Sequence, residues 1–260
     1  MSAPERLRPV APGVLIATSR RDAINTVVVL GPRGAVLLVD PAWTPDELDG
    51  LARELRARHL RPTAGFATHA HFDHLLWHRG FGDGPRWATA ETARRARADR
   101  AALLTELGPG HDRQVLDRLG AVIPVVGDTV PWDGPVVRVI PHDAHVPGHA
   151  ALWLPSHRVL IAGDMLSDIE APLLDPSDAA GDTYAAGLDT LAPFAERALI
   201  VVPGHGRPGR DGVARLQADR RFLAALRTGA PPSDPRLPAR QQDRVPTAGS
   251  WSTGDLLSGP

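Results

Sequence analysis

The stretch THAHFDH, residues 68–74, decides the interpretation of this sequence. It places side chains of the metal-binding kind at His69, His71, Asp73 and His74. In an extended segment the side chains at positions i and i+2 point to the same side, so the first two histidines can hold one ion together. The aspartate and the last histidine follow after the chain turns, and we expect them to face a second ion a few ångström away. The stretch therefore predicts a metal centre.

The composition restricts what can bind these metals. The chain has no Cys, which excludes thiolate ligands, disulfides and a cysteine nucleophile. All 29 basic residues are Arg, so a catalytic lysine is excluded as well. Imidazole and carboxylate ligands without thiolate suit Zn²⁺, although Fe²⁺ and Mn²⁺ accept similar sets.

Four apolar stretches each run directly into a side chain that can bind a metal. AVLLV ends at Asp40, AGFAT at His69, VLIAG at Asp164, and LIVVPG at His205. In open α/β sheets, functional sites form at the carboxyl ends of strands, where a rigid scaffold holds the loops. We therefore expect these side chains to belong to one site.

Size and charge define the broad class of protein. With 260 residues and 43% hydrophobic content, one large domain over residues 1–228 is expected. The formal net charge of −1 provides no global field for nucleic acid or an anionic membrane, so a small-molecule substrate is the expected partner. No signal peptide or run long enough to span a bilayer is recognisable, and a cytoplasmic location is expected. The oligomeric state does not follow from the sequence.

The C-terminal residues 229–260 differ in character from the rest. They are rich in Pro, Ser and polar residues, which predicts a loosely ordered tail that metal binding does not need. Trp251, Leu256 and Leu257 could dock locally on the body.

Short β-branched and aliphatic runs alternate with longer stretches rich in Ala, Arg and Leu, which is typical of mixed α/β architecture. The predicted strands cover residues 13–17, 26–30, 35–39, 64–68, 122–126, 136–140, 150–154, 159–162 and 199–202. The predicted helices cover residues of about 45–59, 90–107, 113–119, 183–195 and 212–226.

The motifs, in this order, resemble those of the metallo-β-lactamase superfamily. The family hallmark H-x-H-x-D-H occurs at residues 69–74. The other matching motifs are LLVDPAW with Asp40, HVPGHA with His149, IAGDML with Asp164 and VVPGHG with His205. The resemblance covers about residues 10–225 and implies an α+β fold, a four-layer αβ/βα sandwich.

The resemblance also implies a dinuclear centre with two zinc ions per chain. Its ligands would be His69, His71 and His149 for one ion, Asp73, His74 and His205 for the other, and Asp164 as the bridge. Asp40 and His145 are expected to hydrogen-bond near the ligands and fix their orientation. We expect His78, His111 and His142 to serve packing or to lie at the surface.

The implied activity is hydrolysis. Two zinc ions that share a water lower its pKa enough to supply hydroxide at neutral pH, and Asp73 is the natural candidate to orient this nucleophile and accept its proton. A bridging Asp164 is more similar to glyoxalase II-type thioesterases, lactonases and phosphodiesterases than to true metallo-β-lactamases, which usually lack it. The favoured substrate is therefore a small ester, thioester or lactone.

Other functions remain open. A phosphodiesterase would use the same metals, and an iron-dependent oxidoreductase similar to persulfide dioxygenases would use two His and one Asp around a single iron. His74 and His205, which such an oxidoreductase would not need for a second ion, favour a hydrolase. A catalytically silent binding module would be expected to have lost ligands, and the motifs retain all of them.

Overall fold

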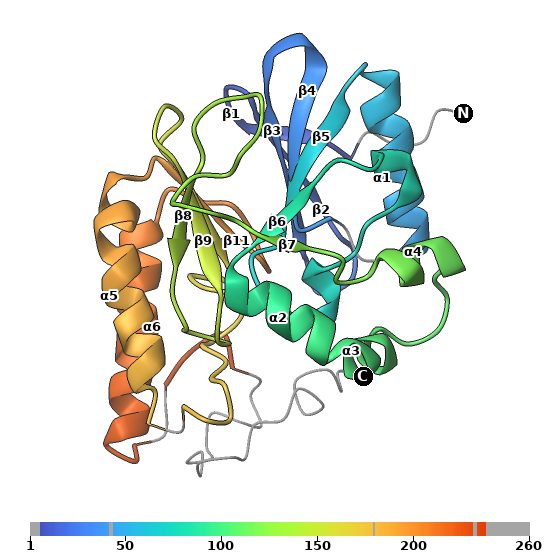
Figure 1. The fold of residues 1–260 in the computed structure, drawn as a ribbon. Helices are drawn as coiled ribbons and strands as arrows, with labels where there is room; N and C mark the ends of the chain where they lie inside the picture. Colours follow the sequence, from blue (N-terminus) through green and yellow to red (C-terminus); the bar gives the residue numbers. More distant parts are fainter. Residues whose placement is uncertain (1–5, 42–43, 179, 231–232, 238–260) are drawn as a thin grey trace.

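The computed structural model describes residues 6–41, 44–178, 180–230 and 233–237. Two β-sheets pack face to face, and helices cover the outer side of each sheet (Figure 1). The layers therefore run helix, sheet, sheet, helix. This arrangement confirms the predicted four-layer αβ/βα sandwich.

The first sheet has seven strands in the order of the chain. Its first four strands pair antiparallel and its last four pair parallel, with β4 shared between the two sets. The strands are β1 (Arg8–Ala11), β2 (Val14–Thr18), β3 (Asn25–Leu30), β4 (Ala35–Val39), β5 (Arg61–Phe66), β6 (Arg86–Ala88) and β7 (Ile123–Pro124). The helices of this half are α1 (Pro45–Ala57), α2 (Ala90–Ala98), α3 (Arg100–Leu107) and α4 (Arg113–Arg118).

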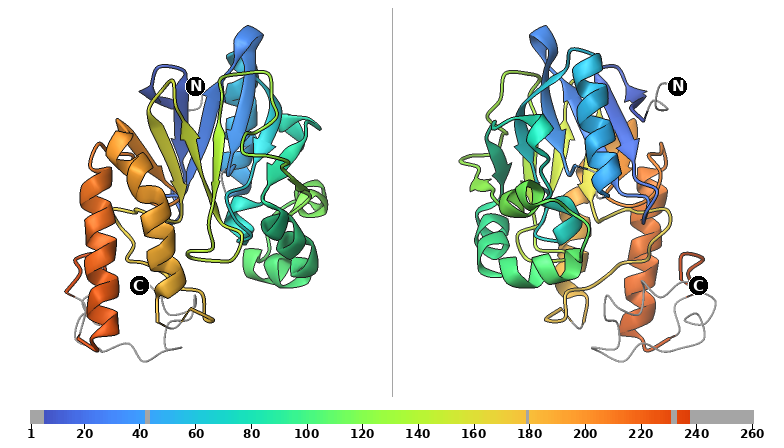
Figure 2. Two further views of the ribbon diagram at one scale, coloured as in Figure 1. Left: turned by 60° about the vertical axis from the view of Figure 1, so that its left-hand side comes forward. Right: turned by 90° about the vertical axis from the view of Figure 1, so that its right-hand side faces the viewer.

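The second sheet has four strands in the order β11-β10-β9-β8. Helix α5 connects β10 to β11, which pair parallel, while α6 follows β11 and packs beside α5 (Figure 2). The elements are β8 (Arg138–Pro141), β9 (Ala150–Leu154), β10 (Val159–Gly163), α5 (Asp182–Arg197), β11 (Ile200–Pro203) and α6 (Gly212–Arg227).

Alternation along the central strands explains how each sheet is covered on both faces. In β3, Val27 and Val29 pack between the sheets, whereas Val28 packs against the helices of the first half. In β10, Val159 packs between the sheets and Leu160 against α5 and α6. Successive strand residues point to opposite faces, so continuous apolar strands are the expected pattern for sheets buried on both sides.

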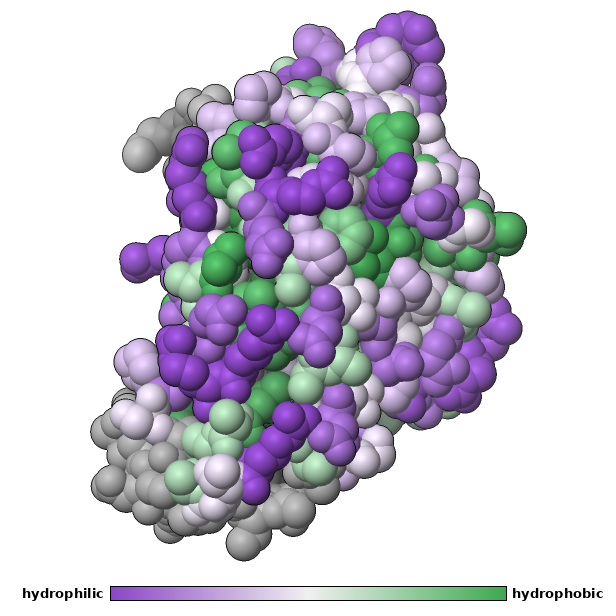
Figure 3. All heavy atoms as spheres, turned by 90° about the vertical axis from the view of Figure 1, so that its left-hand side faces the viewer, coloured by the Kyte–Doolittle hydropathy of each residue, from purple (hydrophilic) through white to green (hydrophobic). Residues whose placement is uncertain are grey.

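The outer helices bury only one side. In α5, the buried residues Tyr184, Leu188, Leu191 and Ala195 recur at helical spacing. Seen from the α5 and α6 side, the surface is largely hydrophilic, with hydrophobic side chains in separate patches (Figure 3). Among the described residues, no helix has the length and hydrophobicity needed to cross a membrane.

Two details differ from the predicted elements. The helix expected over residues 90–107 is two helices, because Asp99 ends α2 with φ −98° and ψ 13° and α3 begins at the next residue. The short strands β1 and β6 were not predicted, since neither contains the run of β-branched residues that signals a strand.

Part of the expected tail is packed rather than loose. Residues 233–237 lie against the body, where Asp234 and Leu237 are buried and Leu237 joins the core beneath α5 and α6. Trp251, Leu256 and Leu257 lie outside the described residues.

Candidate metal centre

The predicted site residues gather at one end of the two sheets. Asp40 directly follows β4, Asp164 directly follows β10, and His205 follows β11 by two positions. The hallmark motif follows β5, with its last residues in a short 3-10 turn over Phe72–His74. Side chains from both halves of the sandwich therefore lie together at this end of the strands.

A first group consists of His69, His71, His145 and Asp164, whose ligand atoms all lie within 4.8 Å of one another. Nδ1 of His71 is 3.0 Å from Nε2 of His69 and 3.1 Å from Nε2 of His145. Oδ2 of Asp164 is 3.4 Å from Nε2 of both His69 and His145. Ligands about 2.1 Å from one tetrahedral zinc lie about 3.4 Å apart, so this spacing fits a shared ion.

A second group consists of Asp73, His74 and His205. Oδ2 of Asp73 is 3.5 Å from Nε2 of His205. Asp164 reaches this group too, because its Oδ1 is 3.3 Å from Nε2 of His74 and its Oδ2 is 3.4 Å from Nε2 of His205. One carboxylate therefore lies between the two groups, in the position expected of a bridge.

The outward nitrogens of two histidines, one in each group, are fixed by backbone oxygen atoms. Nδ1 of His145 donates to the carbonyl of Leu173 at 3.1 Å, and Nδ1 of His205 donates to the carbonyl of Asp22 at 2.8 Å. Because Nδ1 is held as a donor, Nε2 is the nitrogen that faces the group. These carbonyls were not predicted, because every residue has a backbone carbonyl and the sequence does not indicate which of them accepts a hydrogen bond.

Asp40 supports both groups. Its Oδ1 accepts the backbone N–H of Thr68 at 2.9 Å, and its Oδ2 accepts the Thr68 hydroxyl at 2.7 Å and Nδ1 of His74 at 3.0 Å. With its proton given to Asp40, the Thr68 hydroxyl accepts Nδ1–H of His69 at 3.0 Å. Asp40 thus orients ligands, and the unpredicted partner Thr68 directly precedes the motif.

The donor set fits a divalent cation. Nε2 of His74 and Oδ1 of Asp164 are buried, face each other at 3.3 Å, and make no well-formed hydrogen bond among the described residues. Buried polar atoms without partners cost free energy, and a bound cation would satisfy both. The chemistry of the donors, imidazole nitrogen and carboxylate oxygen, is the one that zinc accepts in catalytic sites.

The two groups differ in charge. Burial lowers the pKa of His71 and of His145 to about 4, which leaves both neutral at pH 7. For His205, burial also opposes the charged form, but Asp164 and neighbouring carboxylates raise its pKa to about 10. The pKa of His74 is likewise well above its usual range, because Asp164, Asp73 and Asp40 outweigh burial.

The geometry reverses the expected roles of His145 and His149. The Nε2 atom of His149 accepts the backbone N–H of Asp164 at 3.1 Å, so its proton is on Nδ1, which faces Nε2 of His142 at 3.2 Å. Both nitrogens of His149 are therefore engaged, and neither offers a lone pair to a metal. His145 belongs to the first group of candidate ligands instead, and His149 holds the peptide of Asp164.

A family model described as the metallo-beta-lactamase superfamily matches residues 20–205. The chain belongs to the metallo-β-lactamase superfamily. A curated relative, "Metallo-beta-lactamase type 2" of Bacillus sp. (strain 170), is 24% identical over 193 residues, which are 72% of this chain and 68% of the relative.

Solved structures of the superfamily share the fold. A beta-lactamase domain protein from Burkholderia ambifaria aligns with a TM-score of 0.65 and 23% identity, covering 86% of this chain and 78% of its own. A metallo-beta-lactamase family protein from Thermus thermophilus aligns with a TM-score of 0.65 and 22% identity, covering 85% and 82%. DIM-1 metallo-beta-lactamase aligns with a TM-score of 0.60 and 20% identity, covering 85% and 97%.

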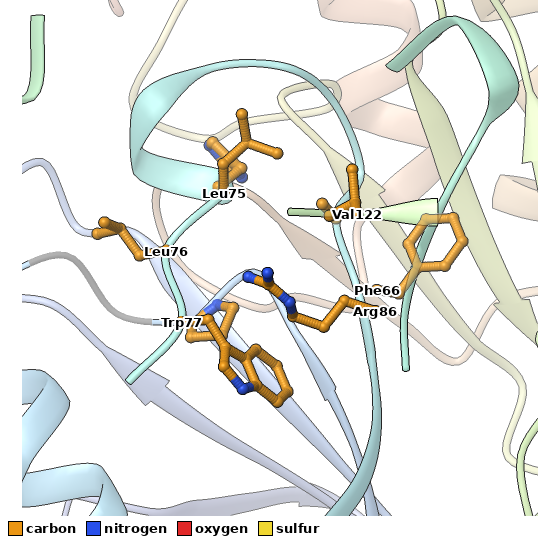
Figure 4. Close-up of a pocket in the computed structure, with 9 residues that line it drawn as sticks. Phe66, Leu75, Leu76, Trp77, Arg86 and Val122 are labelled. Carbon is orange, nitrogen blue, oxygen red and sulfur yellow. The ribbon is translucent and has the colours of Figure 1, made fainter. Parts of the chain in front are cut away.

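The side chains next to His74 are closely packed. Leu75, Leu76, Trp77 and Arg86 line a cavity of only about 10 Å³ (Figure 4), which is room for a single water at most. The guanidinium of Arg86 lies 5.4 Å from the centre of the Trp77 ring. A substrate therefore cannot approach the ligands from this side.

A larger hollow is lined in part by the loop that carries His145, but by none of the candidate ligands. Asp143 and Pro147, on either side of this histidine in the sequence, line a hollow of about 430 Å³. Its other lining residues are Glu91, Asp175, Ser177, Asp178 and Thr183. This volume lies within the usual range for small-molecule pockets.

Proposed function

We propose that this protein is a hydrolase with two zinc ions that acts on a small ester, thioester or lactone. One observation carries the proposal: the carboxylate of Asp164 lies 3.3 to 3.4 Å from histidines of both groups. A carboxylate in this position suits a pair of ions a few ångström apart, the arrangement used in two-metal hydrolysis.

The residues divide the chemistry between them. When bound, the paired ions would lower the pKa of a water and polarise the substrate oxygen. Asp73 is the residue we assign to orient the attacking water and accept its proton, because its carboxylate belongs to the second group and lies 3.5 Å from Nε2 of His205. The candidate histidine ligands other than His71 have Nδ1 held by oxygen acceptors, which keeps the ligand geometry fixed during turnover.

The substrate class rests on the shared carboxylate. Within the superfamily, an aspartate between the metals resembles the thioesterases, lactonases and phosphodiesterases more than the true β-lactamases. The curated relative is named a metallo-beta-lactamase, so β-lactam hydrolysis is the first alternative to test. The net charge of −1 favours a small-molecule substrate over a nucleic acid.

The experiment combines metal loading with a substrate panel. The protein would be stripped with a chelator, reloaded with zinc, iron or manganese, and tested on a chromogenic ester, thioester, lactone, phosphodiester and β-lactam. We expect zinc to restore hydrolysis of an ester, thioester or lactone. Preference for the phosphodiester or β-lactam would replace the substrate class, and activity with one iron per chain would replace hydrolysis by oxidation.

The role of Asp73 is tested with Asp73→Asn in the zinc-loaded protein. Asparagine keeps one oxygen but cannot accept the proton, so turnover should fall by a factor on the order of 10² to 10⁴. Zinc content, measured on the same samples, should fall far less. Asp189→Asn, at a largely exposed carboxylate on α5, is the matched control and should leave both unchanged. Near-normal turnover of Asp73→Asn with full zinc would show that Asp73 is a ligand only.

A further inference from the structure

The segment 233–237 is held against the body by one buried arginine. The side chain of Arg236 is 7% exposed. Its Nε and Nη2 donate to the two oxygens of Asp234 at 2.9 and 2.7 Å, which closes the segment into a tight turn. Leu237 packs into the core beneath α5 and α6. The turn is thus anchored by charge and by apolar contact.

The same guanidinium reaches two parts of the body. Its Nη1 donates to Oδ1 of Asp219, on α6, at 2.6 Å and to the carbonyl of Ser167 at 3.0 Å. Asp219 is 1% exposed, so the ion pair is removed from solvent. A charge-assisted hydrogen bond in such surroundings is stronger and less screened than one at the surface.

The carbonyl that Arg236 holds belongs to the loop that follows Asp164. Leu166, in this loop, has φ +58°, a left-handed conformation that a leucine adopts only when its surroundings hold it there. The side chain of Arg215 donates to the carbonyl of Leu166 at 3.2 Å. Two arginines therefore fix consecutive carbonyls of a strained turn.

The loop in turn holds the backbone around His205. The Ser167 hydroxyl donates to the carbonyl of His205 at 2.8 Å. Oδ1 of Asp168 accepts the backbone N–H of Arg207 at 2.7 Å. A continuous series of hydrogen bonds thus runs from Arg236 through Ser167 to a residue of the second metal group.

We propose that Arg236 is a positioning residue for the second metal group, acting through Ser167 on His205. The segment 233–237 is then a clasp whose docking sets how tightly the second ion binds. Metal in the first group, which the clasp reaches only through the loop after Asp164, depends on it less. The inference rests on the proposed pair of ions.

The test is a double-mutant cycle on the full-length protein. Wild type, Arg236→Gln, Ser167→Ala and the double variant would be titrated with zinc in competition with a chromogenic chelator, which gives a dissociation constant for each ion. We expect each single variant to weaken the second ion by about 10- to 100-fold, the usual effect of a residue that supports a ligand. The first ion should change less than about threefold. The double variant should bind the second ion about as tightly as the single variant with the larger loss, because both changes interrupt one series of contacts.

Arg220→Gln is the matched control, since it removes another Arg–Asp pair, that of Arg220 with Asp189. It should leave both dissociation constants unchanged. If Arg236→Gln does not fold, Arg236→Lys and Ser167→Ala carry the test. Equal weakening of both ions, additive effects in the cycle, or no change in the second ion would overturn the inference. A wild-type protein that binds a single ion would instead overturn the proposed function.

Discussion

The two metal groups are built from the same kinds of side chain, yet they hold protons differently. His71 and His145 in the first group have pKa values near 4, whereas His205 in the second has a pKa near 10. Burial is the largest influence in both groups. Asp164 raises the pKa in both groups, but His205 also has the carboxylates of Glu170 and Asp73 around it.

This contrast predicts how the groups take up metal. A divalent ion can enter the first group without displacing a proton, because its histidines are already neutral. In the second group the ion must replace protons on histidine, so binding there is coupled to proton release. We therefore expect the two ions to bind in sequence, the first group before the second.

The largest effect is expected from removing the carboxylate that the groups share. Asp164→Asn keeps the shape of the side chain but removes its charge, so the ions would lose the group between them. Metal content should fall from two zinc ions per chain to one or fewer, as measured by plasma mass spectrometry. Two tightly bound ions in the variant would mean that the groups are independent.

The next largest effect concerns His145 and His149. His145→Ala removes a ligand and should weaken the first ion by more than about 100-fold, since even supporting residues contribute 10- to 100-fold. His149→Ala removes only the hydrogen bond to the Asp164 peptide and should weaken it by about tenfold. The reverse order in zinc titrations would make His149 the ligand, as the sequence motif implied.

A similar effect is expected for Asp40, which bonds to His74 directly and to His69 only through Thr68. Asp40→Asn should weaken the second ion by about 10- to 100-fold and the first ion less. Chelator competition on Asp40→Asn and Thr68→Val would separate the two routes. Thr68→Val should affect mainly the first ion, and equal effects on both ions would contradict this division.

The smallest effect, counted per pH unit, is the pH dependence. His205 is protonated below its pKa of about 10, so affinity for the second ion should rise with pH, by up to about tenfold per unit for each proton released. With pKa values near 4, His71 and His145 are neutral above about pH 5, so affinity for the first ion should stay flat from pH 6 to 8. Calorimetry in buffers of different ionisation enthalpy counts the released protons. Equal proton release by both ions would contradict the contrast.

Much of the site followed from local sequence signals. The motif at residues 69–74 and the strands ending at Asp40, Asp164 and His205 predicted which side chains meet, because strand ends fix where loops begin. The exchange of His145 and His149 could not be predicted in this way. His145 has φ +70°, a left-handed backbone conformation that residues other than glycine seldom adopt and that the sequence pattern does not predict.

The parts of the fold that consist of continuous buried strands were predictable from the sequence. The parts that depend on one or two residues were not. Continuous apolar strands such as β4 and β10 follow from sheets covered on both faces. The break between α2 and α3 and the three-residue strand β6 depend on single residues and neighbouring strands. The docking of residues 233–237 depends on the ion pair between Arg236 and Asp219, which are distant in the sequence. The composition of the segment does not predict such a pair.

The most direct measurement is the metal content and stepwise affinity of the purified, full-length protein. Zinc would be titrated into the stripped protein while bound metal is counted by mass spectrometry. Two ions per chain are predicted, with the first binding independently of pH and the second releasing protons. One ion per chain at saturation, or a single tightly held iron that zinc does not replace, would contradict a dinuclear zinc centre.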